Sequence, residues 1–261
     1  MKTGIDFDDA AARGVERMYL TPDVVGQRAR FLEALALRPG EHVLDVGVGP
    51  GLLAHDMAAI VGERGRVAGI DLSEPMLEMS RRRCADQPWT DFQSADATVL
   101  PFEDESFDAL VSTQVYEYVA DMDKALSEAF RVLRPGGRVL ILDTDWDSAL
   151  WHVADRERSR RVMAAWDEHL HDPHLPATLG PRLRRAGFRA GRCEVIPILN
   201  TSYHPHCYSF GILFAIQGFV AGRGGVTAED AADWAADVRS QEEAGAYFFS
   251  INRYIFGASK P

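Results

Sequence analysis

The feature that most constrains the fold is an alternation of short β-branched runs with helical patterns between residues 41 and 145. Five strands are predicted, at HVLDVG, RVAGIDL, TDFQSAD, FDALVSTQ and GRVLILDTD, and most are separated by a predicted helix, at about 52–61, 75–85 and 122–133. Strands connected through helices pair in parallel, and the helices cover both faces of the sheet. The alternation therefore predicts a doubly wound α/β fold with a mostly parallel sheet.

The flanking segments complete this prediction. Residues 6–37 are expected to form two N-terminal helices, the second capped by Thr21 with Pro22 in its first turn. Residues 146–176 interrupt the alternation with a charged helical segment and a histidine-bearing loop, which predicts a helical insertion after the fifth strand. Residues 177–261 are expected to add helices and two strands, the last one antiparallel and closing the sheet edge. We therefore expect one domain over residues 1–261, a Rossmann-like seven-stranded sheet whose cofactor-binding core is 41–145.

Charge and composition narrow the classes of partner. The formal net charge is −11, so an extended basic surface for nucleic acid or anionic lipid is not expected. The three cysteines are widely spaced and form no C-x-x-C pair, which favours a reducing compartment over a disulfide framework or zinc ribbon. No signal sequence and no apolar run of about 18 residues is present. A cytoplasmic protein without membrane or nucleic-acid partners is predicted.

A glycine-rich turn is the strongest local indication of a ligand. Gly47, Gly49 and Gly51 follow a buried strand and precede a helix, where the backbone must bend tightly and let a ligand approach. The spacing is G-x-G-x-G, and Leu52 stands where a dinucleotide site has its third glycine. Asp45, at the mouth of the turn, would repel a pyrophosphate. The turn is therefore predicted to bind a ligand that has an ammonium group and no phosphate.

The segment LDVGVGPG resembles the first motif of the class I S-adenosylmethionine-dependent methyltransferases, including the small-molecule enzymes of ubiquinone and menaquinone biosynthesis. VAGIDLS, SADATVLPFEDESFDAL and LRPGGRVLILD resemble later motifs of the same family, so the resemblance covers residues 41 to about 145 closely. It implies that Asp71 accepts hydrogen bonds from both ribose hydroxyls. It also implies that Asp96 accepts from the adenine amino group and that the Ala97 amide meets the ring.

The resemblance implies further contacts with S-adenosylmethionine outside these motifs. Gln114, after the fourth strand, would lie against the methionine portion, and Tyr19 and Arg28 would reach the cofactor from the N-terminal helices. The complete predicted cofactor set is Asp45, Gly47, Gly49, Gly51, Asp71, Leu72, Asp96, Ala97, Gln114, Tyr19 and Arg28.

Candidates for the methyl-acceptor side follow the fourth and fifth strands and lie in the insertion, because ligands of open α/β sheets sit at the carboxyl ends of the strands. The residues predicted to be catalytic are His171, Asp145 and Tyr116; other candidates are Glu117, Tyr118, Asp143, Trp146, His169 and His174. Glu117 departs from the histidine often found hereabouts in related enzymes. The H-x-H-x-x-H pattern at 169–174 lacks a further ligand that would complete a metal set, so no metal is predicted.

The predicted function is methyl transfer from S-adenosylmethionine, by in-line displacement, to a small and partly hydrophobic molecule. Three alternatives stay open at this point: a protein or RNA acceptor, a catalytically inactive cofactor-binding partner protein, and a nicotinamide dehydrogenase, which Asp45 and Leu52 disfavour. The acceptor atom, the need for a general base, and the choice between monomer and homodimer are not determined by the sequence.

Overall fold

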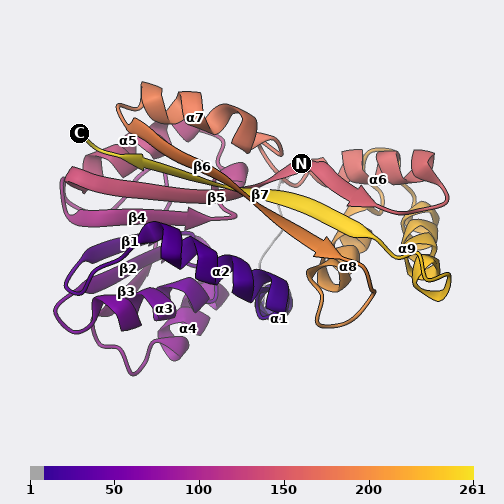
Figure 1. Cartoon of the computed structure of the whole chain (residues 1–261), viewed down its shortest axis with the longest axis horizontal. Helices are drawn as coiled ribbons and strands as arrows, with labels where there is room; N and C mark the ends of the chain where they lie inside the picture. Colours follow the sequence, from indigo (N-terminus) through magenta and orange to yellow (C-terminus); the bar gives the residue numbers. More distant parts are fainter. Residues whose placement is uncertain (1–8) are drawn as a thin grey trace.

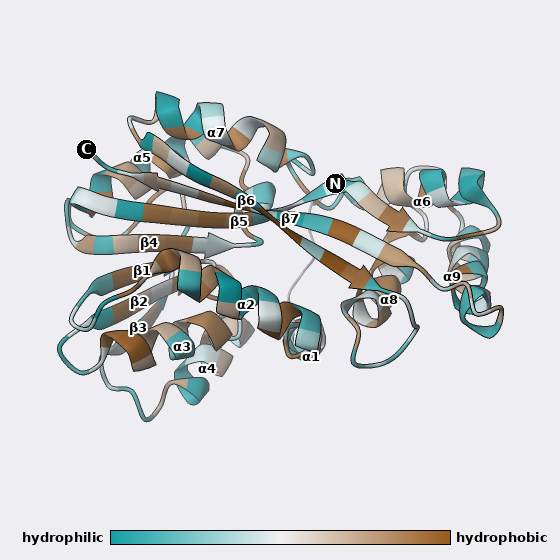
Figure 2. Ribbon diagram, viewed as in Figure 1, coloured by the Kyte–Doolittle hydropathy of each residue, from teal (hydrophilic) through white to brown (hydrophobic). Residues whose placement is uncertain are grey.

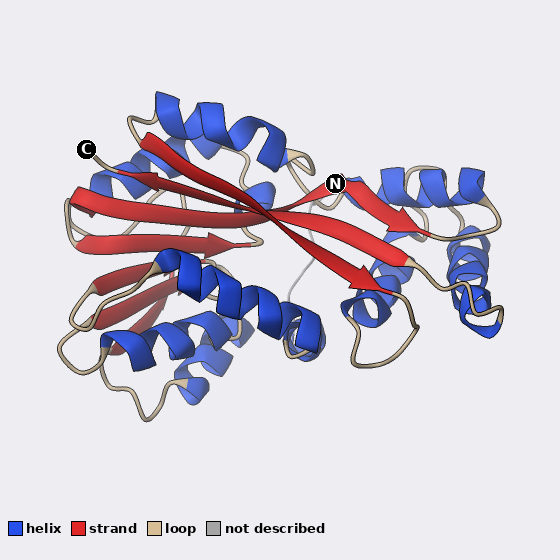
Figure 3. Cartoon of the chain, in the orientation of Figure 1, coloured by secondary structure: helices blue, strands red, loops and turns tan. Residues whose placement is uncertain are grey.

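The computed structural model describes residues 9–261, so the first residues of the predicted N-terminal helix, 6–8, lie outside it. Figures 1 and 3 show the arrangement of the elements. The helices are α1 (Asp9–Tyr19), α2 (Pro22–Leu35), α3 (Leu52–Val61), α4 (Glu74–Arg83), α5 (Met122–Val132), α6 (Arg156–Asp167), α7 (Leu175–Arg185), α8 (Tyr208–Val220) and α9 (Ala228–Glu243), with a 3-10 turn at Tyr116–Tyr118. The strands are β1 (His42–Val46), β2 (Arg66–Asp71), β3 (Thr90–Ser94), β4 (Phe107–Thr113), β5 (Leu133–Trp151), β6 (Arg189–Asn200) and β7 (Phe249–Ser259).

Within the described residues the strands form one seven-stranded sheet in the order β3-β2-β1-β4-β5-β7-β6. Strands β1 to β5 pair in parallel, and β7 is antiparallel to both of its neighbours. The strand order reverses between β1 and β4, which is where open α/β sheets bind ligands. The predicted doubly wound sheet with an antiparallel last strand is confirmed.

The position predicted for the last strand is wrong, because β7 lies inside the sheet between β5 and β6 and does not close its edge. The edge strand is β6, which is exposed at most of its positions and carries Arg192, Glu194 and Pro197. Charged side chains and proline suit an edge, since they block further pairing. In β7 every second residue from Phe249 to Ile255 is buried, as an interior strand requires.

Helices cover both faces of the parallel part of the sheet (Figure 3). On one face α2, α3 and α4 pack on the strands, and Phe31, Leu35 and Met57 are among their buried contacts. On the other face α5 and α7 contribute Leu126 and Leu179 to a second buried cluster. Figure 2 shows that the central strands are the most hydrophobic part of the chain, as expected for strands buried on both faces.

A second, helical part is built on the extended ends of β5, β7 and β6, at the right in Figure 1. Residues 146–151, predicted to begin the helical insertion, continue β5, and Trp151 pairs with Phe249 of β7. Helices α6, α8 and α9 pack around these strand ends, and Trp166, Trp234 and Leu213 are fully buried there. We call this part the helical lobe. Helix α8 is one of the helices predicted after residue 177. Within residues 9–261 no helix combines the length and the hydropathy that a membrane crossing requires.

Helix α1 spans the gap between the parallel sheet and the helical lobe, because it contacts α4 on one side and α8 on the other. The turn from α1 to α2 differs from the prediction in one detail. Thr21 is the N-cap residue of α2 and Pro22 follows it, but the Thr21 hydroxyl donates to the Met18 carbonyl at 2.8 Å and accepts no cap hydrogen bond. The hydroxyl therefore fixes the end of α1, which holds this helix over the carboxyl edge of the sheet.

Candidate functional site

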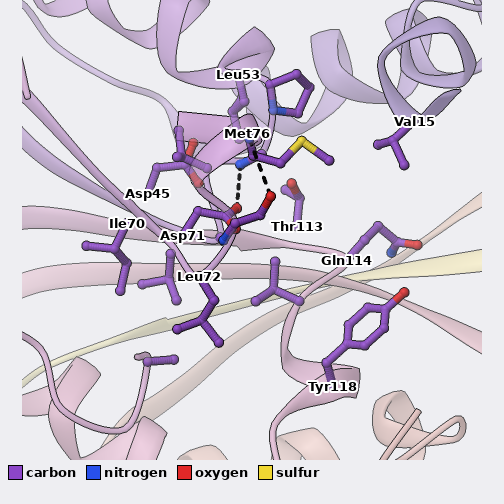
Figure 4. Close-up of a pocket in the computed structure, with 18 of the residues that line it drawn as sticks. Val15, Asp45, Leu53, Ile70, Asp71, Leu72, Met76, Thr113, Gln114 and Tyr118 are labelled. Atoms are coloured by element: carbon purple, nitrogen blue, oxygen red, sulfur yellow. Dashed lines mark hydrogen bonds between the residues drawn. The ribbon is translucent and has the colours of Figure 1, made fainter. Parts of the chain in front are cut away.

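A cavity of about 850 Å³ lies at the carboxyl ends of the central strands, between the parallel sheet and α1. Figure 4 shows Asp45, Asp71 and Leu72 on one side of it, and Gln114, Tyr118 and Val15 on the other. Ten of the eleven residues predicted to contact the cofactor line this cavity, and Gly51 is the exception. The volume falls within the range typical of ligand pockets.

Glycine is needed at the three positions of the turn for different physical reasons. All three have positive φ angles, of 75°, 54° and 77° at Gly47, Gly49 and Gly51. A Cβ on Gly47 would lie 2.2 Å from the Val115 side chain, and one on Gly51 would lie 2.8 Å from the Ser80 backbone. A Cβ on Gly49 would meet nothing within 4 Å. Gly47 and Gly51 thus allow close packing of elements, whereas only Gly49 presents open backbone to the cavity.

Asp71 ends β2 and holds the glycine turn in place. One of its carboxylate oxygens accepts from the Gly49 amide at 2.9 Å, and the other accepts from the Ser73 amide at 2.9 Å. The Ser80 hydroxyl donates to the Gly49 carbonyl at 2.7 Å, which fixes the peptide group on the other side of the Gly49 Cα. Burial raises the pKa of Asp71. Asp71 therefore has a structural role in addition to any contact with a ligand.

Asp45 is unusual in the cavity wall because its acidic side chain is buried. Its carboxyl is 1% exposed, and neither oxygen has a hydrogen-bond partner among the residues that the structure describes. Burial, and secondarily the nearby charge of Asp71, raises the pKa of Asp45 to about 8. A buried carboxylate without a donor is costly unless a ligand supplies the donor or a positive charge. Asp45 is therefore placed to bind a cationic group of a ligand.

The residues predicted for the adenosine portion lie on the same side of the cavity. Asp96 accepts from the Thr98 amide at 2.7 Å and the Thr98 hydroxyl at 2.8 Å, both at one carboxylate oxygen. Leu72 is 73% exposed although it lines the cavity, and Ala97 is buried. We call Asp45, Asp71 and Asp96 the acidic end of the cavity.

Gln114, directly after β4, has a φ of 59°, which is unusual for a residue other than glycine. Its backbone amide donates to the Leu142 carbonyl at 2.7 Å, and its side-chain oxygen accepts from the Thr144 hydroxyl at 2.6 Å. Strained backbone that is held by such bonds is common at functional sites. The bonds fix the Gln114 side chain in the cavity wall, beside the glycine turn.

The two residues predicted from the N-terminal helices also reach the cavity. Burial raises the pKa of Tyr19 above its ordinary range, so its phenol stays protonated. Arg28 donates to the Asp56 carboxylate at 2.9 Å and to the Tyr19 carbonyl at 3.3 Å. Arg28 is thus already neutralised by a neighbouring acid, while it ties α2 to the end of α1.

The structure does not bring the three predicted catalytic residues together. His171 lines the cavity, and its backbone amide donates to the Glu117 carbonyl at 3.0 Å. Tyr116 is 1% exposed and packs in the hydrophobic core below the cavity, among residues of α5 and β4. Asp145 lies outside the cavity wall and its carboxylate is 3.3 Å from His174 Nδ1. Of the three, only His171 is placed to contact a ligand.

His174 lies in an exposed group with Asp145 and Asp147, apart from the other histidines of its loop. The three donor atoms all lie within 4.8 Å of one another, as in a metal site, and they form the one such group that residues 9–261 contain. Asp147 is 79% exposed and His174 is 41% exposed, so an ordinary surface ion pair accounts for the arrangement. The predicted absence of a metal stays a prediction.

His169 is the histidine of the insertion that the fold buries in the cavity wall. It is 2% exposed, and its Nδ1 bonds to the Trp166 carbonyl. A carbonyl only accepts, so Nδ1 carries the proton and Nε2 keeps its lone pair. Burial lowers the pKa of His169 to about 4, which favours the neutral ring. His169 was one of the wider set of candidates, and the sequence alone did not separate it from His171.

Arg253 of β7 lines the cavity, and the sequence analysis missed it altogether. It is 1% exposed. The signal that could have found it is the alternation of β7, in which Arg253 occupies the buried register between Ile251 and Ile255. An arginine at such a position requires a specific reason. We call Arg253, Tyr118 and His169 the arginine end of the cavity.

Comparisons with known proteins agree with this geometry. A family model described as a methyltransferase domain matches residues 44–141. The chain is 43% identical to demethylmenaquinone methyltransferase of Symbiobacterium thermophilum over 197 residues, which cover 67% of this chain and 78% of that protein. It is 38% identical over 189 residues to an uncharacterized 37.1 kDa protein in transposon TN4556 of Streptomyces fradiae. That match covers 71% of this chain and 54% of the relative, so the chain spans about half of that relative's length.

Solved structures show the same fold. Phosphoethanolamine N-methyltransferase 2 of Haemonchus contortus, in complex with S-adenosyl-L-methionine, superposes with a TM-score of 0.64 at 22% identity, over 98% of this chain and 58% of that one. The sheet order, the glycine turn with its buried acid, and the Symbiobacterium relative lead to one assignment. The chain belongs to the class I S-adenosylmethionine-dependent methyltransferase family.

Proposed function

We propose that this protein transfers a methyl group from S-adenosylmethionine to a small, partly hydrophobic molecule, and that both bind in the 850 Å³ cavity. The observation that carries the proposal is the Asp45 carboxyl, which is buried without a hydrogen-bond partner directly before a glycine turn. A pyrophosphate would be repelled at this position, whereas the ammonium of S-adenosylmethionine would supply the missing charge and donors.

The rest of the acidic end suits the same ligand. The open backbone at Gly49 leaves room for the amino-acid portion, and Asp71 keeps free lone pairs for ribose hydroxyls after accepting the Gly49 and Ser73 amides. Asp96 uses one carboxylate oxygen for Thr98, so the other is free for the adenine amino group. Gln114 and Tyr19 would border the methionine portion.

When bound, S-adenosylmethionine supplies a methyl group on a positively charged sulfur, which is already a strong electrophile. The chain's own residues then have chiefly to orient the acceptor and to exclude water. Tyr19, Tyr118 and Val24 supply an apolar wall for the acceptor. Because the positive charge on the sulfur disperses during methyl transfer, a dry and weakly polar wall favours the reaction.

His169 is our candidate for removing a proton from the acceptor. Its Nε2 has no hydrogen bond within residues 9–261, and its ring is fixed by the Trp166 carbonyl and by stacking on Trp166 at 3.8 Å between ring centroids. Nε2 would accept the proton of an acceptor that carries O–H or N–H. An acceptor that is already anionic would need no such step.

The size and enclosure of the cavity support a small acceptor. It is roofed by α1 and by the loop at 169–171, so a folded protein or RNA could present at most a single side chain or base. The net charge of −11 also disfavours RNA. A close relative named demethylmenaquinone methyltransferase is further support for a small-molecule acceptor with an apolar body.

The test is release of S-adenosylhomocysteine from S-adenosylmethionine in the presence of a panel of small phenols, amines and carboxylic acids. The panel is compared with bulk RNA and with a mixture of unfolded proteins. Release that depends on one class of small molecule, and that is lost in the Gly49→Val variant, supports the proposal. Release that depends only on protein or RNA would replace the proposed acceptor. Tight cofactor binding without release in any arm would favour an inactive partner protein.

A further inference from the structure

Arg253 is a charged residue at a position where β7 would ordinarily place an apolar one. Its side chain is 1% exposed, like those of Ile251 and Ile255 on the same face of the strand. A guanidinium stays protonated in a protein interior, so burial does not remove its charge. A buried charge is retained at such a position only when something pairs with it.

The contacts of Arg253 within the protein are all with neutral groups. One terminal nitrogen donates to the Gln27 side-chain oxygen at 2.6 Å, and Nε donates to the Thr144 hydroxyl at 3.2 Å. The guanidinium carbon lies 4.5 Å from the centroid of the Tyr208 ring. These two donations and a side-chain hydrogen bond with the Tyr208 hydroxyl leave two of the five N–H donors for a ligand, and they hold the guanidinium plane in one orientation.

No carboxylate forms an ion pair with Arg253. Among residues 9–261 no acidic oxygen lies within 4.0 Å of its nitrogens. The nearest buried acids, Glu117 and Asp143, have other donors: Trp146 Nε1 at 3.2 Å and the Val115 amide at 3.0 Å. Burial raises the pKa of Glu117 to about 8 and that of Asp143 in the same direction, by more than Arg253 lowers either. Neither acid is therefore an ion-pair partner of the guanidinium in contact with it.

The place of Arg253 in the sheet puts it beyond the methionine end of the proposed cofactor position. The Thr144 hydroxyl links the two, because it donates to Gln114 at 2.6 Å and accepts from Arg253 at 3.2 Å. Strand β7 lies three strands from β1, which carries Asp45. Since neighbouring strands are about 4.8 Å apart, the backbones of Asp45 and Arg253 are at least roughly 14 Å apart across the sheet. Arg253 also lies four residues along β7 from Gly257, the residue in the row of Asp45. The ammonium and carboxylate of one amino acid share a carbon, so they do not span these two positions.

The walls around the guanidinium are apolar and aromatic. Tyr19, Val24, Tyr118 and His169 line the same part of the cavity. Aromatic side chains of this kind bury a ring or other apolar body. The arginine end thus combines an apolar wall with one fixed positive charge.

We propose that the methyl acceptor carries a carboxylate on an apolar, ring-containing body, and that Arg253 is the specificity-determining residue that binds this carboxylate. This inference rests on the proposed function for its use of the cavity, but the anion site itself can be tested without any methyl transfer. A bidentate carboxylate would use the guanidinium donors that Gln27, Thr144 and Tyr208 leave free.

The test measures binding of benzoate and of its neutral analogue benzamide, by calorimetry, to the full chain with and without saturating S-adenosylhomocysteine. We expect benzoate to bind at least about tenfold more tightly than benzamide, and Arg253→Gln to reduce this preference below about twofold. Equal binding of the two compounds would overturn the proposal. So would failure of benzoate to bind at about 20 mM, because a fixed guanidinium without an ion-pair partner in the cavity wall should hold it at that concentration.

Two matched variants separate the possible sources of a change. Arg253→Lys keeps the charge but loses the planar donors, so it should keep part of the preference for benzoate. Arg28→Gln removes a guanidinium of the cavity wall that already pairs with Asp56, so it should weaken S-adenosylhomocysteine and leave the benzoate preference unchanged. If Arg253→Gln instead weakens S-adenosylhomocysteine by more than about tenfold, Arg253 binds the cofactor carboxylate and the proposal is wrong.

The outcome is also distinguishable from failure of the proposed function. If wild-type protein does not bind S-adenosylhomocysteine, the methyl-transfer proposal fails while the benzoate preference of the chain alone still reports on Arg253. Circular dichroism and thermal unfolding test whether the Arg253→Gln variant is folded. If it is unfolded, the Arg253→Lys variant tests the proposal: its preference for benzoate should be lost on adding chloride, since chloride competes for the same charge.

Discussion

The acidic end and the arginine end of the cavity are built in opposite ways. The acidic end consists of acids at the ends of β1 and β2 and in the loop after β3, all within residues 45–96. The arginine end brings together Arg253 of β7, Tyr118 after β4, and His169 of the insertion. One end holds a buried acid, Asp45, without a donor, and the other holds a guanidinium without an ion-pair partner within residues 9–261. The contrast teaches that one ligand site can be encoded in a short segment, whereas the site that we propose for the acceptor depends on distant segments meeting.

The largest expected effect breaks the acidic end alone. Gly49→Val should weaken S-adenosylhomocysteine by at least about a hundredfold, because its side chain would enter the open space where the ligand approaches. Isothermal calorimetry measures the affinity. The matched control is Gly40→Val, since Gly40 also has a positive φ and open surroundings but lies outside the cavity. Both variants should lose a similar amount of stability from backbone strain; equal cofactor affinity in both would show that the turn does not bind the ligand.

The second effect tests the charge of the acidic end through pH. Asp45 in the free protein has a pKa of about 8, and a bound ammonium would lower it. Below that pH Asp45 must release a proton when the ligand binds. The affinity for S-adenosylhomocysteine should therefore rise with pH, by up to about tenfold per unit between roughly pH 5.5 and 7, where the amino group of the ligand stays an ammonium. Calorimetry in buffers of different ionisation enthalpy measures both the slope and the proton release. A flat profile in the wild type, or an unchanged slope in Asp45→Asn, would contradict the assignment.

The third prediction concerns stability. The unfolded chain loses the Asp45 proton near the ordinary value of 3.8, whereas the folded protein keeps it until about 8. The free energy of unfolding should therefore fall as pH rises through this window. Asp45→Asn removes that loss and should raise the stability of the ligand-free protein by up to about 5 kcal/mol at pH 7.5, at about 1.4 kcal/mol for each pH unit above 3.8. Urea unfolding at several pH values measures it. Asp71→Asn is the control and should be destabilising, because Asp71 accepts the Gly49 and Ser73 amides.

The smallest effect separates the two histidines nearest the acceptor. His171→Ala should lower turnover by less than about tenfold, since positioning dominates the rate. His169→Ala should lower it further, and only for acceptors that must lose a proton, because His169 alone is buried with a fixed tautomer. Initial rates of S-adenosylhomocysteine release measure both. A loss beyond about a thousandfold in His171→Ala would assign the base role to that residue instead.

The sequence by itself determined the parallel sheet and the acidic end. Hydrophobic runs of the right length alternate with helices, and Asp45, Gly49 and Asp71 sit at or just after the ends of the first two of these strands. Ligand contacts encoded within one short segment need no knowledge of long-range packing. The same is true of the difference between this turn and a dinucleotide turn, which rests on Asp45 and Leu52 alone.

Only the tertiary structure decided the arginine end. The insertion of β7 between β5 and β6 places Arg253 against Gln27, a residue 226 positions earlier in the chain. It also decided where two of the predicted catalytic residues lie: Tyr116 turns into the core, and Asp145 lies within β5 and pairs with His174. The physical reason is that strand order and side-chain direction arise from long-range pairing and packing, which the local pattern of residues does not specify.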